Sequence, residues 1–410
     1  MSSINEAPAR GKTNRPHIAI VGAGIGGLAL ALALQRRGFS PVVIEKRSAE
    51  QIRGDGLFLT LAPNGINALR ALGLAEAVIG GGLDTRGIAL FNERGKRIAL
   101  MDYGTHSARF GAPSSTIRRG VLGGVLLDAA LRDGIDLHLG ASLEGLRETS
   151  DGVTLEVEGI GESFDAVIAC DGLRSSVRRL AFPKLPPPRY SGLIGTGGVI
   201  DVPGVAATDG LMNMTFGTKA FFGYLKEGDG PVLWFNTYPA PESEIGPIAD
   251  PRAYARKVAA LHAGDPLDNA KILAAVPGID RNFPVYDMDE LSTWSTPRVL
   301  LMGDAAHAVA PHSGQGASMA IEDALVLAAC LDDDPSIGAA FARFETLRRE
   351  RVATAIAIGR QAGSQKHAQS WLALRIRDLI LPLVMPMGVK AQERMFRFRA
   401  DLTPLALPVQ

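Results

Sequence analysis

Cysteine, tryptophan and an excess of either charge are scarce in this sequence. Its 410 residues include only two cysteines, Cys170 and Cys330, and three tryptophans, and 43 Lys and Arg balance 43 Asp and Glu. The balance gives no electrostatic reason to expect a nucleic acid or an anionic membrane as partner. Two cysteines, each among apolar neighbours, are typical of small buried side chains in a reducing compartment, and we expect the cytoplasm.

Long hydrophobic runs are also absent. The segment 379–387 is apolar but contains two prolines and is shorter than the ~20 residues that a membrane-spanning helix needs. We expect a docked C-terminal segment there, with weak contact to a membrane surface as the alternative. Residues 1–14 are polar, contain no apolar stretch that would act as a signal, and are predicted to form a flexible tail.

Several familiar catalytic patterns are missing too. The sequence shows no metal-ligand cluster, no Ser-His-Asp pattern and no P-loop lysine, so we predict no metal site. What it does have is 46% apolar residues, enough for a large core, and a length that fits two or three domains.

A glycine-rich turn follows the apolar strand-like run at 18–21 and precedes a helix-forming run at 28–37. Its glycines have G-x-G-x-x-G spacing. The first allows a tight turn, the second lets backbone approach a pyrophosphate, and the third lets the helix pack closely on the strand. The helix N-terminus then faces the phosphates with free N–H groups. The predicted nucleotide-binding turn is Gly22-Ala23-Gly24-Ile25-Gly26-Gly27.

An acidic residue stands where such a unit needs one. Glu45, followed by Lys46, ends the second strand-like run, 23 residues after Gly22. A carboxylate there accepts hydrogen bonds from adenosine ribose hydroxyls and repels the 2′-phosphate of NADP. The unit therefore predicts a site for FAD or NAD.

A second glycine-rich segment lies almost three hundred residues later. Gly303 and Asp304 follow the strand-like run 297–302, and a carboxylate at a strand end can hold a ribityl or ribose hydroxyl. Gly314 and Gly316 precede a clear helix pattern, whose first N–H groups, at Gly316 and Ala317, would stabilise negative charge on a reduced flavin. Two such segments predict one extended cofactor held at both ends, and FAD fits.

Three motifs together make the chain resemble the FAD-dependent aromatic hydroxylases, the class A flavoprotein monooxygenases similar to p-hydroxybenzoate hydroxylase. They are the turn at 22–27, the segment 165–178 with Asp171-Gly172, and the segment 303–316. One small departure is Cys170, where that family usually has alanine or glycine. The resemblance covers most of the chain.

The resemblance implies roles for further residues. The Asp171 segment would serve FAD and the nicotinamide donor. Arg119, with Arg118 as the adjacent alternative, would contact the flavin side of FAD, and Arg53 would lie near the isoalloxazine. The implied activity is that of a monooxygenase: NADPH or NADH reduces the flavin, oxygen adds to it, and a flavin hydroperoxide hydroxylates or epoxidises a small aromatic or polycyclic substrate.

We predict an α/β fold: a Rossmann-like FAD-binding domain, a substrate domain with a mixed or antiparallel sheet, and C-terminal helices. The FAD-binding domain is discontinuous, at 15–75, 104–180 and 285–360. The substrate domain takes 76–103 and 181–284, where strand-like alternation recurs, and a helical segment takes 361–410. The protein is expected to be a monomer or homodimer without stable membrane insertion.

The substrate pocket should lie between the second domain's sheet and the flavin. Pro311 and His312 are the candidate catalytic residues, because His312 beside the flavin loop can orient or deprotonate a phenol. Candidate walls are the apolar residues Met212, Met214, Phe216, Phe222, Tyr224 and Trp234.

Three alternatives stay open. A flavin-dependent halogenase would carry a Trp-x-Trp-x-Ile-Pro segment, and the three tryptophans here are isolated. A flavin reductase or dehydrogenase would act without inserting oxygen. A flavin-binding sensor or scaffold would have no activity.

Overall fold

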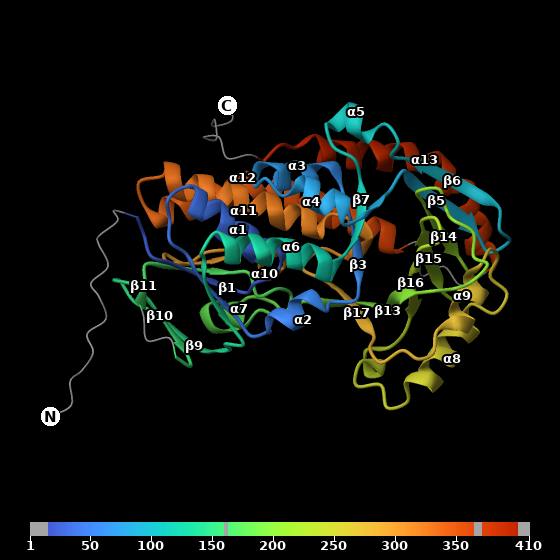
Figure 1. Ribbon diagram of the computed structural model, residues 1–410, viewed down its shortest axis with the longest axis horizontal. Coiled ribbons are helices and arrows are strands. Elements are labelled where there is room, and N and C mark those ends of the chain that lie inside the picture. The colour runs from blue at the N-terminus through green and yellow to red at the C-terminus, as the bar shows by residue number, and fades with distance from the viewer. Residues whose placement is uncertain (1–14, 160–162, 365–370, 401–410) are drawn as a thin grey trace.

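The computed structural model describes residues 15–159, 163–364 and 371–400 (Figure 1). The predicted tail, 1–14, and parts of the predicted C-terminal segment, 365–370 and 401–410, lie outside the described residues. Two sheets dominate the fold, and both contribute to the candidate site.

The first sheet has five strands, all parallel, in the order β18-β12-β1-β2-β8. Four of them are short, fully buried runs, as expected for parallel strands that are covered on both faces. Their carboxyl ends meet at one edge, where open α/β sheets bind ligands. The strands are β1 (Ile18–Val21), β2 (Val42–Glu45), β8 (Asp136–Leu139), β12 (Ala166–Ala169) and β18 (Val299–Leu301).

Helices cover this sheet (Figure 1). On one side α1 packs against both α6 and α11, and α11 packs against α3 and α12, while α7 contacts β18. The alanine- and leucine-rich α1 is almost entirely buried in the process. The helices are α1 (Ile25–Arg36), α3 (Pro63–Ala71), α6 (Arg119–Arg132), α7 (Ser176–Ala181), α11 (Gly316–Asp333) and α12 (Ile337–Ser364).

The second sheet has seven strands in the order β17-β13-β16-β15-β14-β5-β6. All neighbours are antiparallel except β5 and β14. Residues of α8 (Pro251–Leu261) and α9 (Asn269–Ala275) share a separate apolar core with one of its faces. The strands are β5 (Gly87–Asn92), β6 (Arg97–Asp102), β13 (Arg189–Ile200), β14 (Leu211–Phe216), β15 (Phe221–Lys226), β16 (Val232–Pro239) and β17 (Phe283–Asp287).

The remaining elements connect these parts. Two three-stranded sheets, β3-β7-β4 and β11-β10-β9, flank the first sheet, and the long α13 contacts β6, α3 and α12. Their bounds are β3 (Phe58–Leu61), β4 (Leu83–Asp84), β7 (Ser115–Arg118), β9 (Leu143–Glu148), β10 (Val153–Val157), β11 (Ser163–Phe164), α2 (Ala49–Arg53), α4 (Ala75–Gly80), α5 (His106–Phe110), η1 (Glu242–Glu244), α10 (Asp304–His307), η2 (Pro311–Ser313) and α13 (Trp371–Arg397).

A buried ionic network joins the helices behind the second glycine segment. Arg348 of α12 is fully buried and pairs with Glu322 and Asp323 of α11, at 2.8 and 2.6 Å. Asp323 also bonds Nε2 of His307, at 2.7 Å, and Asn64 donates to Glu322, at 2.6 Å. Each buried charge therefore has an opposite partner, as burial requires.

The predicted fold class is confirmed. Strands from all three segments assigned to the FAD-binding domain meet in the parallel sheet, and strands from both substrate-domain segments form the second sheet. The predicted boundary at 284/285 falls inside β17. The apolar run 379–387 lies within α13, and no helix in the described part of the chain has the length and hydropathy of a membrane span.

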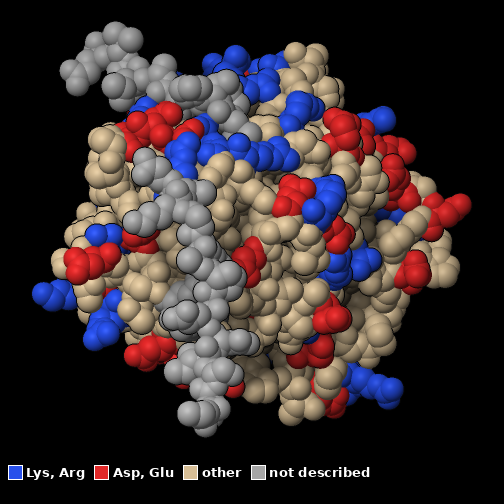
Figure 2. All heavy atoms as spheres, turned by 60° about the vertical axis from the view of Figure 1, so that its left-hand side comes forward, with Lys and Arg blue, Asp and Glu red and all other residues tan. Residues whose placement is uncertain are grey.

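The surface agrees with the charge balance. Figure 2 shows Lys and Arg interspersed with Asp and Glu over the face it presents, with large neutral areas between them. On this face no broad region of one charge gathers that would attract a polyanion.

Candidate functional site

One cavity, of about 1040 Å³, joins the two sheets. Its lining includes residues that follow β1, β2, β12 and β18, and residues of the seven-stranded sheet, α12 and α13. We call the first set the cofactor half and the second set the sheet half. A cavity at the upper end of the range for ligand sites has room for an extended molecule.

The three glycines of the first motif are needed for different physical reasons. Gly22 has φ +109°, and a Cβ there would lie 2.4 Å from the carbonyl oxygen of Cys170. A Cβ on Gly27 would lie 1.9 Å from the carbonyl oxygen of Gly22, so these two glycines are required by the fold. A Cβ on Gly24 would meet no protein atom closer than 4.0 Å, and Gly24 lines the cavity. Its missing side chain therefore leaves room for whatever the cavity holds.

The start of α1 faces the same space. Gly22, Gly24, Ile25 and Gly26 all line the cavity, and Gly24 is the N-cap of α1. The first N–H groups of this 12-residue helix, at the positive end of its dipole, face the cofactor half. Two residues of the predicted turn do not line the cavity: Ala23 and Gly27 support it from behind.

Glu45 is a fixed carboxylate at the end of β2. It is 5% exposed, and its Oε2 accepts a hydrogen bond from the N–H of Ala23, at 2.8 Å. Burial opposes its ionisation, but the guanidinium and N–H of Arg47, with the N–H of Ala23, outweigh burial and hold the pKa of Glu45 below its usual value. Glu45 and the exposed Lys46 both line the cavity. An ionised, immobile acceptor is what a pair of ribose hydroxyls needs.

Asp171 offers an unused acceptor. It follows β12, and its Oδ2 caps α7 by accepting from the N–H groups of Ser176 and Val177, at 2.6 and 3.2 Å. Its Oδ1 is buried without a hydrogen-bond partner in the described part of the chain, and Asp171 lines the cavity. A buried acceptor left unpaired costs free energy, so this oxygen fits a ligand that brings a donor. Ser175 caps the start of α7.

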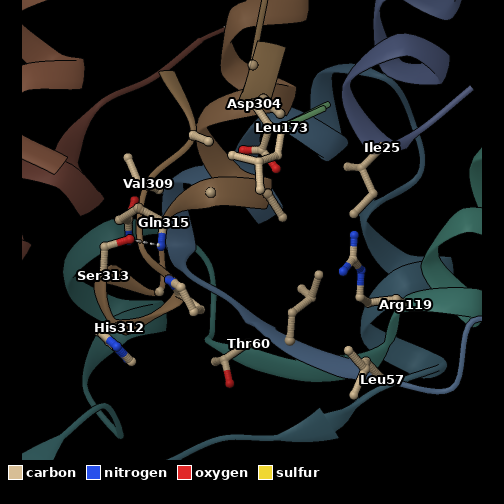
Figure 3. Close-up of a pocket in the computed structure, with 18 of the residues that line it drawn as sticks. Ile25, Leu57, Thr60, Arg119, Leu173, Asp304, Val309, His312, Ser313 and Gln315 are labelled. Carbon is tan, nitrogen blue, oxygen red and sulfur yellow. Dashed lines mark hydrogen bonds between the residues drawn. The ribbon is translucent and has the colours of Figure 1, made fainter. Parts of the chain in front are cut away.

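Asp304 and Arg119 bring opposite charges to the wall of the cavity, on different sides of it (Figure 3). Asp304 opens α10 shortly after β18. Desolvation by the surrounding protein raises the pKa of its carboxyl, against the lowering effect of the charges of His307 and Arg119. Arg119 is the first residue of α6, and its Nε lies 3.6 Å from Oδ2 of Asp55. Arg119 lines the cavity and Arg118 does not, which favours Arg119 of the two predicted alternatives.

The second glycine segment forms a wall. Gly303 has φ +59° and Gly314 has φ +62°, backbone states that glycine adopts without strain. Gln315 is fixed by its N–H to Ser313 Oγ, at 3.2 Å, drawn in Figure 3, and by the side chain of Asn64, at 3.0 Å. The predicted residues of this segment all line the cavity: Gly303, Asp304, Pro311, His312, Gly314, Gly316 and Ala317.

The two histidines of this segment have different surroundings. His307 is buried and bonds Asp323, so it supports the turn at Asp304. His312 is half-buried, lines the cavity, and packs against Gly363 of α12, where a Cβ would lie 2.9 Å from His312 Cδ2. Its catalytic role stays a prediction, as does that of Pro311.

Half of the predicted substrate wall faces the wrong way. Met212, Met214 and Phe216 line the cavity, but Phe222, Tyr224 and Trp234 do not. The latter three lie in the core beneath α8 and α9, where the rings of Phe222 and Trp234 stack at 6.0 Å.

The hairpin register explains this error. Phe216 pairs with Phe221, so the even-numbered residues of β14 share a face with the odd-numbered residues of β15. Gly223 of β15 pairs in turn with Phe235 of β16. Neighbouring side chains of a strand point to opposite faces of the sheet. Phe221 and Phe235 therefore line the cavity, and their neighbours Phe222 and Trp234 do not.

Arg53 requires a second correction. It ends α2 and pairs with Asp128 of α6, at 2.6 Å, and it is not among the residues that line the cavity. Its charge is satisfied on the surface, so the structure does not place it at a flavin ring.

Sequence reasoning missed several lining residues. Ile88 and Leu90 lie on β5, in a segment whose apolar alternation predicted strands. No motif in the sequence indicated that this strand lines the site. Gln361 of α12 and Gln392 of α13 also line the cavity, and no motif marks them. Among the described residues, no group of three or more His, Cys, Asp or Glu side chains is arranged to hold a metal ion.

Comparisons with known proteins agree with this geometry. Residues 15–208 and 283–362 match the family described as "FAD binding domain". The chain is 33% identical over 381 residues to an aurachin C monooxygenase/isomerase of Stigmatella aurantiaca, covering 92% of this chain and 96% of that protein. It is 28% identical over 336 residues to an FAD-dependent urate hydroxylase of Klebsiella pneumoniae, covering 81% and 86%.

A solved structure shows a similar fold with ligands bound. The Klebsiella pneumoniae protein HpxO, crystallised with FAD and uric acid, superimposes with a TM-score of 0.81 at 25% identity. The superposition covers 93% of this chain and 97% of that one.

Proposed function

The chain belongs to the FAD-binding family of aromatic monooxygenases, and from this premise we propose which residues bind its cofactor and substrate. It is an FAD-dependent monooxygenase, as the three sequence motifs predicted. FAD, once bound, accepts electrons from NAD(P)H and activates O2, and the protein binds, orients and shields the reactants.

One observation supports the assignment of residues most directly. The same cavity runs from the glycine turn after β1 to the apolar face of the seven-stranded sheet. At the turn, Gly24 leaves space and Glu45 offers an ionised acceptor, which suits the pyrophosphate and adenosine ribose of FAD. Farther along, Asp171 Oδ1 is an acceptor without a donor, and Asp304 is a further acceptor that suits the ribityl hydroxyls.

The flavin ring is proposed to lie against the second glycine segment. Gly314 and Gly316 leave backbone exposed to the cavity, and α11 begins at Gly316. The free N–H groups at the start of this 18-residue helix would stabilise negative charge on the pyrimidine edge of a reduced ring. Arg119 adds a positive charge on the cavity wall.

The substrate is proposed to bind in the sheet half. There Met212, Met214 and Phe216, with Phe221 and Phe235, form an apolar wall that excludes water from the reacting atoms. His312 stands on the lining of the same cavity and is proposed to orient or deprotonate a phenol, with Pro311 beside it. The FAD-binding part would comprise 15–75, 104–180 and 285–360, the substrate part 76–103 and 181–284, and the C-terminal helical segment 361–410.

Further features of the working enzyme are proposals too. NADPH or NADH would bind transiently, and O2 and a small aromatic or polycyclic compound would be the other reactants. Both cysteines are free, which fits a reducing compartment, and we propose the cytoplasm. The enzyme would act as a monomer or homodimer.

The test is a direct assay of the purified chain. We expect a yellow protein that NAD(P)H bleaches in the absence of oxygen and air restores, and a phenol product heavier by one oxygen atom. Chloride incorporation would identify a halogenase instead, and turnover without oxygen incorporation would identify a dehydrogenase. A colourless protein that takes up no FAD would contradict the proposed site as a whole.

A further inference from the structure

Charge is distributed unevenly along the cavity. The Asp, Glu, Lys and Arg residues that line it all end or follow β2, follow β12 or β18, or open α6, whose first residue, Arg119, we count with the cofactor half. Among the described residues that β5, β6, β13 to β17, α12 and α13 contribute to the lining, none is Asp, Glu, Lys, Arg or His. These elements therefore contribute only apolar side chains and neutral polar groups, and the proposed base His312, on η2, is a titratable side chain elsewhere on the same lining.

An anionic substrate would bind poorly in such a place. A carboxylate taken out of water needs an opposite charge or several donors, and without them its burial costs several kcal/mol. The cations that line the cavity stand in the cofactor half. A neutral aromatic loses little solvation and gains apolar contacts with the sheet.

Two neutral polar atoms in the sheet half have no hydrogen-bond partner among the residues that the structure describes. They are Oγ1 of Thr237 on β16 and Oε1 of Gln392 on α13, and both atoms are buried. A buried carbonyl-type oxygen without a donor is costly, so the side-chain amide of Gln392 favours a ligand that carries an N–H or O–H. Gln392 lies on α13 between Val389 and Phe396, two residues that also line the cavity.

We propose that the substrate is an uncharged, largely apolar aromatic compound whose N–H or O–H donates a hydrogen bond to the Gln392 carboxamide. This proposal rests on the proposed FAD monooxygenase function and specifies its substrate class. Gln392 acts as a specificity-determining residue: it binds one polar edge of a ring whose remaining surface is apolar.

The first experiment measures dissociation constants by the change that a ligand causes in the flavin absorbance of the holoenzyme. Three matched pairs differ by one carboxylate: 4-hydroxyquinoline and its 2-carboxylate, 2-naphthol and 3-hydroxy-2-naphthoate, phenol and 4-hydroxybenzoate. We expect the neutral member of each pair to bind about tenfold more tightly or better, because the carboxylate is desolvated without a partner. If no neutral member binds more tightly than its carboxylated partner, the proposal is wrong.

The second experiment tests Gln392. Gln392→Leu should weaken binding of 4-hydroxyquinoline about tenfold and leave 4-methoxyquinoline, which has no donor, unchanged. Gln392→Lys adds a cation and should improve binding of the 2-carboxylate about tenfold or more. Arg394→Leu, an exposed residue on the same helix, is the matched control and should change none of these values.

The outcomes separate this proposal from the one on which it rests. Unchanged affinity of Gln392→Leu for 4-hydroxyquinoline would remove Gln392 from the substrate site. A yellow enzyme that prefers the carboxylated probes would overturn the neutral substrate while leaving the monooxygenase intact. A chain without flavin would instead contradict the proposed function itself.

Discussion

Phe221 and Phe222 are neighbours in β15 but face opposite sides of the seven-stranded sheet. Phe221 lines the cavity with Phe216, its cross-strand partner, and their rings are 4.9 Å apart. Phe222 is fully buried on the other face, where its ring stacks on Trp234 and meets His262 edge-on. One residue therefore belongs to the site and the next belongs to the core.

This arrangement predicts different effects of the two truncations on substrate binding. Phe221→Ala should raise KM for the aromatic substrate and also lower stability, because Phe221 lines the cavity and is 3% exposed, packed with Leu90 and Phe216, whereas Phe222→Ala should leave KM unchanged. Phe222→Ala should lower the free energy of unfolding by about 3–5 kcal/mol, the usual cost of removing a buried phenylalanine. Denaturant unfolding and steady-state kinetics of both variants test the register, and a reversed pattern would contradict it.

The glycines of the first motif give a second matched pair. Gly24 has φ −75° and ψ −176°, which any residue adopts, and an open Cβ position, so Gly24→Val should fold but lose FAD. Gly27→Ala places a Cβ 1.9 Å from a carbonyl oxygen and should disturb folding itself. Flavin content and circular dichroism separate the two effects. A Gly24→Val protein that retains its yellow colour would show that nothing binds over this turn.

Asp304 should contribute directly to flavin retention. Asp304→Ala removes a proposed charge-assisted hydrogen bond to FAD, worth ~1.5–3 kcal/mol, and should raise the dissociation constant of FAD by roughly ten- to a hundredfold. Dialysis against increasing dilution, followed by flavin absorbance, measures the change. Asp128→Ala removes an exposed carboxylate outside the cavity and is the control. Equal flavin retention in both variants would argue against a ligand contact at Asp304.

The buried network behind the second glycine segment should dominate local stability. Arg348→Met leaves Glu322 and Asp323 short of a cation in a fully buried place, and breaking a buried pair costs about 3–5 kcal/mol. Arg132, exposed and paired with Asp133, is the control, and Arg132→Met should cost about 1 kcal/mol or less. Denaturant unfolding of both variants is the test, and the free energy of unfolding should fall by about 2 kcal/mol or more further in Arg348→Met than in Arg132→Met. A small loss for Arg348→Met would mean that the network contributes little.

His106 should make the protein sensitive to acid. Burial, with the nearby charge of Arg109, lowers the pKa of His106 from 6.5 to about 4, and Nδ1 of His106 lies 3.0 Å from Oγ of Ser114. Between these two pH values the unfolded chain binds more protons at this residue than the folded one. Stability is therefore complete above pH 6.5 and falls as the pH drops toward 4, by on the order of 3 kcal/mol.

The check is a pH series of unfolding free energies. His106→Gln keeps a hydrogen-bonding side chain but does not titrate, so its profile should be flatter between pH 6.5 and 4. Parallel profiles for the two proteins would assign the acid loss to other groups.

Local sequence determined much of this protein. The turn at Gly22, the acidic strand end at Glu45 and the segment from Gly303 to Ala317 were placed correctly at the cavity. Each of these depends on interactions a few residues long, and at Gly22 and Gly303 a positive-φ glycine follows a strand and a helix begins beyond it. Such signals survive in sequence because the backbone itself requires them.

Tertiary structure alone decided the substrate side. The side on which Phe221, Phe222 and Trp234 lie follows from the strand register, which apolar alternation does not reveal when both faces of a sheet are buried. Arg53 lies on the surface, away from the cavity, where it pairs with Asp128, 75 residues away in the sequence. Gln392 entered the cavity only because α13 packs back across β6, a contact between segments almost three hundred residues apart. Local sequence thus specified the nucleotide turns, and long-range packing specified the pocket in which the substrate is proposed to bind.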